Sequence, residues 1–169
     1  MATVSAPNRS FIAWLFVAGG VLQVIAVALL LGNVGDVNAL WAISNLAIGV
    51  GFVLMAAWLS RAMISVLAYI IAAIGWLLLA LTSIVNLGFF GSIAVFIAIV
   101  GSLFAGVVVY TSHPFTPNAD RLFLIAMIAA AINLLVSQNG NVPPLLKDLI
   151  VITFGGLLVA AGFLILRKR

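Results

Sequence analysis

Six long apolar stretches, separated by short polar breaks, run along the chain. A transmembrane α-helix needs about 20 apolar residues to cross roughly 30 Å of hydrocarbon, and each stretch has close to that length. The pattern therefore predicts an all-α integral membrane protein whose residues 1–169 form a single six-helix transmembrane domain. The predicted helices lie near residues 11–31, 39–59, 63–86, 91–111, 120–137 and 148–167.

The second and third stretches are separated by only Ser60, Arg61 and Ala62. Without Arg61 the two would form one apolar run far too long for a single span. A helical hairpin that turns at Arg61 is the simplest interpretation.

The hairpin pattern recurs along the chain. Asparagines end the odd-numbered stretches at a constant spacing of 53 residues: Asn33, Asn86 and Asn139. Each even-numbered stretch has a glycine followed 12 residues later by a basic or titratable residue, in the pairs Gly49/Arg61, Gly101/His113 and Gly155/Arg167. We interpret this as three hairpin repeats, 11–61, 63–113 and 120–169, in parallel orientation, since a two-span unit restores the starting side. Chance is the alternative, because apolar sequences align easily.

Charge sets the predicted orientation. Only 6% of the residues are charged, 66% are hydrophobic and the mean hydropathy is +1.41, far outside the range of soluble domains. On alternate sides of the predicted spans, one side carries six bases and the other only Lys147. The positive-inside rule then places both termini in the cytoplasm, in a bacterial-type inner (plasma) membrane. The net charge of +4 reports topology here, so we expect lipid contact and no nucleic-acid partner.

Catalytic chemistry has little support in this sequence. Cysteine is absent and His113 is the only histidine, so we expect no metal and no cofactor. No ionisable residue lies deep in a predicted span, which disfavours ion-coupled transport. His113 with nearby Asp120 and Arg121 is the only group suited to acid–base work, and we interpret His113 instead as a cytoplasmic topology anchor, like Arg61 and Arg167. The sequence therefore predicts a protein that is not an enzyme.

The polar residues deep in the spans are amides and hydroxyls. Gln23, Asn45 and Asn133 fall in the predicted outer half of the membrane. They would either form a pocket for a neutral solute or a lipid or quinone head group, or hydrogen-bond between helices, and the second interpretation is favoured. Small residues four positions apart predict close helix contacts, either inside the bundle or between subunits of an oligomer, and packing inside the bundle is favoured. The pairs are Ala47/Gly51, Gly101/Ala105, Ser102/Gly106, Gly156/Ala160 and Ala126/Ala130.

Together these patterns favour a non-enzymatic integral membrane subunit or scaffold that packs against other membrane subunits or against itself. The alternative is a passive channel or carrier for a small neutral solute. In outline, the layout of three hairpins and six helices resembles the acid-resistance HdeD-like family, which would imply a stress-related membrane protein. This resemblance is one of layout and assigns no residue.

Overall fold

The structure, a computed structural model, describes residues 6–59, 62–85 and 88–167. In this part of the chain there are six helices and no strand. Each helix is long and apolar enough to cross a membrane. The predicted all-helical, multi-pass membrane architecture is thus confirmed. The helices are α1 (Ala6–Leu31), α2 (Asn38–Trp58), α3 (Met63–Thr82), α4 (Phe89–Ser112), α5 (Pro117–Ser137) and α6 (Pro144–Leu166).

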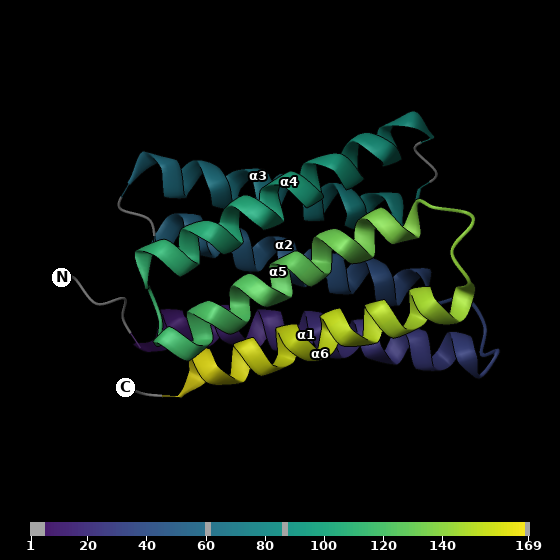
Figure 1. Ribbon diagram of the computed structural model, residues 1–169, viewed down its shortest axis with the longest axis horizontal. Helices are drawn as coiled ribbons and strands as arrows, with labels where there is room; N and C mark the ends of the chain where they lie inside the picture. Colours follow the sequence, from purple (N-terminus) through teal and green to yellow (C-terminus); the bar gives the residue numbers. More distant parts are fainter. Residues whose placement is uncertain (1–5, 60–61, 86–87, 168–169) are drawn as a thin grey trace.

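The six helices form a closed ring. Each packs against its two neighbours along the chain, and α6 packs against α1. One end of the ring, the terminal end, is where α1 begins and α6 ends, and it also carries the α2–α3 and α4–α5 connections (Figure 1). The other end, the hairpin end, carries the connections within the three helix pairs.

Aromatic side chains fill the centre of the ring. Phe16, Phe52 and Phe123, from α1, α2 and α5, meet edge to face with ring centroids 5.2–6.1 Å apart. Trp76 of α3 stacks on Phe154 of α6 at 5.7 Å. Because these contacts join helices on opposite sides of the ring, side chains occupy its axis, and aromatic pairs of this kind prefer just such geometries.

Glycines allow the closest helix contacts. A Cβ atom added to Gly75 of α3 would lie 2.4 Å from the Ala98 backbone of α4, and one added to Gly101 would lie 2.5 Å from the Ala72 backbone. Gly20 of α1 and Gly155 of α6 face each other in the same way. Such backbone approach is the usual reason for small residues in membrane helices, where packing replaces the hydrophobic effect.

Most predicted small-residue pairs are internal, but one is not. Gly101, Ser102, Ala105, Gly106, Ala126 and Ala130 are buried. Gly156 and Ala160 are exposed, and a Cβ atom at Gly156 would meet nothing within 4 Å. The prediction of internal packing is therefore wrong for this pair, because it lies on the outward face of α6.

The helix ends differ from the predicted ends mainly at prolines. Helix α5 begins at Pro117, three residues earlier than expected, and its N-cap Thr116 accepts a hydrogen bond from the Ala119 N–H at 3.3 Å. Helix α6 begins at Pro144, four residues earlier than expected. Proline is favoured in the first helical turn, where its missing N–H would have no partner anyway.

The repeat is only partly visible in the packing. Gly49, Gly101 and Gly155 all lie at helix contacts, beside Leu77, Ala72 and Gly20. Gly49 and Gly155 contact the next hairpin, whereas Gly101 contacts its own partner helix. Asn86 and Arg61 lie outside the described residues. The triplication therefore stays a prediction.

Candidate functional site

Two of the three predicted amides meet inside the ring. Gln23 of α1 donates from Nε2 to Asn45 Oδ1 of α2 at 3.2 Å, and both side chains are buried. Asn45 Nδ2 in turn lies 3.5 Å from Ser83 Oγ at the end of α3, and Ser83 donates to the Leu79 carbonyl. We call Gln23, Asn45 and Ser83 the amide chain. Asn133 of α5 is buried, but it has no hydrogen bond to Gln23 or Asn45 in the described part of the chain.

The amide chain is incomplete at one atom. Gln23 is only 2% exposed, and its Oε1 has no hydrogen-bond partner among the described residues. In hydrocarbon such an acceptor costs several kcal/mol, because no lipid group can donate to it. The amide chain therefore links α1, α2 and the end of α3 by hydrogen bonds, as the favoured interpretation predicted. It also leaves one buried polar atom, Gln23 Oε1, open to a further hydrogen bond.

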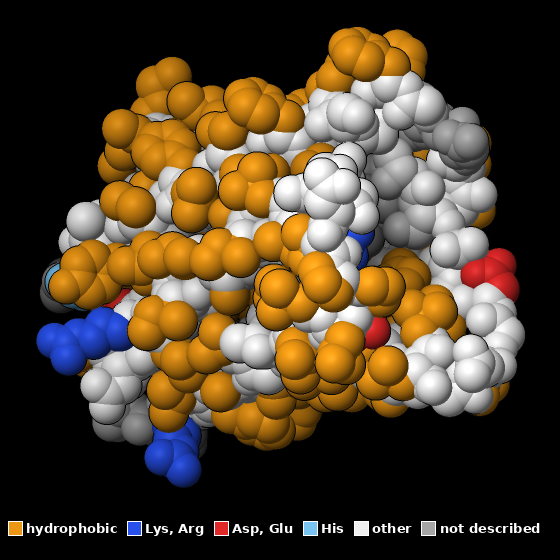
Figure 2. All heavy atoms as spheres, turned by 45° about the vertical axis from the view of Figure 1, so that its right-hand side comes forward, with side chains coloured by type: hydrophobic (Ala, Val, Ile, Leu, Met, Phe, Trp, Pro, Cys, Tyr) orange, Lys and Arg blue, Asp and Glu red, His pale blue; other side chains and the backbone are white. Residues whose placement is uncertain are grey.

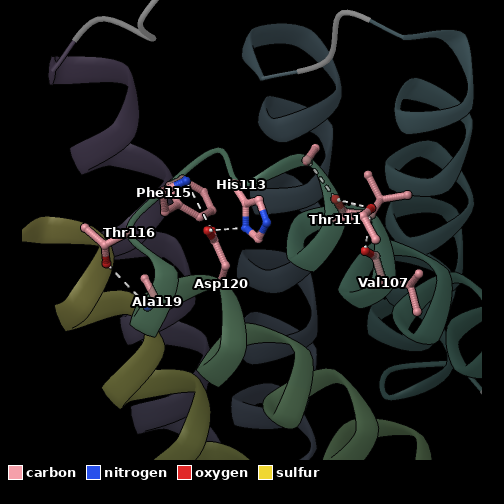
Figure 3. A network of polar contacts seen from close by, with 9 residues as sticks. Val107, Thr111, His113, Phe115, Thr116, Ala119 and Asp120 are labelled. Atoms are coloured by element: carbon pink, nitrogen blue, oxygen red, sulfur yellow. Dashed lines mark hydrogen bonds and ion pairs between the residues drawn. The ribbon is translucent and has the colours of Figure 1, made fainter.

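A second polar cluster lies at the terminal end, around Asp120 (Figure 3). Asp120 is in the first turn of α5 and is fully buried. Its Oδ1 accepts a bond from the Phe115 N–H at 3.2 Å, and its Oδ2 lies 3.4 Å from Nδ1 of His113. Tyr69 of α3 is also buried. Its hydroxyl lies within hydrogen-bonding distance of the Ser112 side chain and close enough to Asp120 to interact with the charge of that carboxylate. The cluster ties the α4–α5 connection to the bundle.

His113 ends α4 in an unusual backbone conformation. Its φ is +50°, in the left-handed region, and its N–H bonds to the Val109 carbonyl. The residue turns the chain away from the helix, much as glycine does at many helix ends. Its side chain is 59% exposed and packs edge to face with Tyr110 at 6.0 Å. This geometry fits the interfacial position predicted for His113.

The described basic residues gather at one end. Arg9, Arg121 and Arg167 belong to the terminal end, together with His113, whereas Lys147 stands in the first turn of α6 at the hairpin end. On the face seen in Figure 2, hydrophobic side chains cover much of the surface between the two ends. Two predicted anchors, His113 and Arg167, thus share an end, and the third, Arg61, lies outside the described residues. No three metal-ligating side chains come together among the residues described.

The sequence did not single out Ser83, Tyr69 or the burial of Asp120. A signal existed for Asp120: it is three residues before Phe123 and seven before Met127, both buried, so all three share one face of α5. Ser83 gave no such signal.

No family model matches this chain, and no curated protein or solved structure matches it. The resemblance to the HdeD-like family therefore rests on layout alone. Class and fold, a six-helix multi-pass membrane protein, come from the chain itself.

Proposed function

We propose that this protein is a non-enzymatic subunit or scaffold of a membrane complex, in contact with lipid, and that it binds another membrane helix through α6. The outward face of α6 carries the observation behind this proposal. Thr153, Gly156 and Ala160 are exposed there in succession, and Gly156 has no neighbour within 4 Å of a Cβ position. Most other glycines within the spans of this protein, such as Gly20, Gly75 and Gly101, lie at a tight helix contact.

Neighbouring helices present a different outer face. Helix α5 shows a row of bulky side chains, Ile125, Ile128, Ile132 and Leu135. Between α5 and α6 a groove of about 320 Å³ opens next to Thr153. A shallow helix face beside a groove is the shape that lets a partner helix approach closely. The groove is lined by Ala129, Ile132, Leu146, Leu149, Ile150 and Thr153.

The test is the size of the particle in mild detergent. We expect the wild-type protein to run as a complex larger than one chain, and Gly156→Leu to release a single chain, because leucine would hold a partner helix away. Within the chain the substitution faces open space, so the single chain of the variant should unfold at the same temperature as a single wild-type chain separated from its partner. Ala57→Leu, on the exposed face of α2, is the matched control and should keep the complex. A wild-type protein that runs alone as a monomer would rule this function out.

The alternative is a carrier or binding protein for a small neutral solute, and the open Gln23 Oε1 is the observation that favours it. The aromatic contacts across the ring favour the subunit over a pore along the axis. A solute site would then be confined to the half of the ring nearer the hairpin end.

We also propose that both termini face the cytoplasm of a bacterial-type inner membrane and that the three helix pairs are repeats. The excess of bases at the terminal end supports this orientation. The chain has no cysteine, so single cysteines report it directly. We expect an impermeant maleimide to label Asn139→Cys in intact cells, and Asn118→Cys only after lysis. The reverse pattern would invert the topology.

A further inference from the structure

The open atom of Gln23 is not an accident of how its amide is oriented. Oxygen and nitrogen of an amide are exchanged by a flip, and their assignment follows from the hydrogen-bond network. If Gln23 and Asn45 were both flipped, Gln23 Oε1 would accept from Asn45 Nδ2, and Asn45 Oδ1 would accept from Ser83. Gln23 Nε2 would then be the open atom. In either orientation one polar atom of this buried side chain faces away from Asn45 without a partner.

A hydroxyl group can form a hydrogen bond with the open atom of Gln23 in either orientation of the amide. It donates to an open oxygen and accepts from an open N–H, whereas a carbonyl or an ammonium can serve only one of them. A neutral group is also required, because no described charged residue bonds to the amide chain, and an unpaired charge at this depth would be expensive.

Exposure along the amide chain indicates the direction of access. Gln23 is 2% exposed and Asn45 is 8% exposed. Ser83 is half-buried where α3 ends, at the hairpin end. Polar groups therefore lead inward from that end to the open atom, and the guest must be small because Gln23 is almost fully enclosed.

The geometry points to a binding site at Gln23 for a hydroxyl group, supplied by a water molecule or by a small neutral hydroxyl compound that enters from the hairpin end. Asn45 and Ser83 are positioning residues: Asn45 holds the Gln23 amide, and Ser83 holds Asn45. This site is independent of any partner bound to α6.

Water-edited solid-state NMR on the full chain in liposomes tests this site. The chain has two glutamines, Gln23 and the exposed Gln138, so ¹⁵N-glutamine labelling gives one buried signal and one wet reference. The Gln23→Met variant assigns the two. A second sample labelled with ¹⁵N-tryptophan, assigned with Trp76→Phe, supplies the dry reference: the indole of Trp76 is 1% exposed and donates to Ser102 at 2.9 Å.

We expect magnetisation from water to appear on the Gln23 side-chain amide at mixing times at which it also appears on Gln138 but not yet on the Trp76 indole. Glycerol then separates the two sources. A transfer to Gln23 that falls with added glycerol while Gln138 is unchanged identifies a solute site, and an unchanged transfer identifies bound water. A Gln23 amide as dry as the Trp76 indole, with and without glycerol, would overturn the proposal.

Discussion

Gly75→Ala is expected to force α3 and α4 apart and to lower the thermal unfolding temperature of the protein in detergent. The added Cβ would lie 2.4 Å from both N and Cα of Ala98, and backbone atoms cannot turn away as a side chain can. Overpacking by one methyl group typically costs about 1–3 kcal/mol, and a contact with backbone belongs at the upper end of that range. Gly101→Ala should behave alike, since it meets Ala72 of α3 at 2.5 Å.

Gly156→Ala is the control for these variants when unfolding is measured on the single chain, in a detergent that removes the partner proposed for α6. It adds the same methyl group to the middle of a helix, but nothing lies within 4 Å of the new atom. Alanine also favours helix over glycine by about 1 kcal/mol in water, so this variant should unfold at the same temperature or higher. Equal losses in Gly75→Ala and Gly156→Ala would show that close α3–α4 packing does not limit stability.

The sequence was sufficient to predict the six helices because hydrocarbon thickness fixes their length. It was not sufficient for the ring, since apolar residues that face lipid resemble those that face another helix. Gly156 and Ala160 illustrate the difficulty: their spacing equals that of the buried pair Gly101 and Ala105. Lipid and protein interior are equally apolar, so hydropathy cannot separate the two faces of a span.

Polar positions were predicted better than their partners. Gln23 and Asn45 were expected to bond across helices, and they do. Asn133 was grouped with them because of its depth, but depth along a helix does not determine the direction of a side chain. Ser83, the C-cap residue of α3, took the third place instead, because its Oγ lies 3.5 Å from Asn45 Nδ2.

Asp120→Leu is expected to destabilise the protein strongly, even though Asp120 lies close to the end of the bundle. Its Oδ1 accepts a hydrogen bond from the N–H of Phe115, which is itself buried, and leucine would remove this bond. A hydrogen bond to a charged group contributes about 1.5–3 kcal/mol, and loss of a carboxylate from a buried network adds to the cost. Asp120→Asn keeps an oxygen at the same place and should be milder. Unfolding in detergent, followed by circular dichroism, measures both.

The His113→Ala variant removes the contact between His113 and the Asp120 carboxylate and leaves the hydrogen bond from the Phe115 N–H in place. The His113 side chain is 59% exposed, and an ion pair with one exposed partner is worth about 0–1 kcal/mol. We therefore expect His113→Ala to cost far less than Asp120→Leu, because the carboxylate stabilises the α4–α5 connection chiefly through the backbone of Phe115. Equal losses of stability in the two variants would instead show that Asp120 stabilises the connection chiefly through its ion pair with His113.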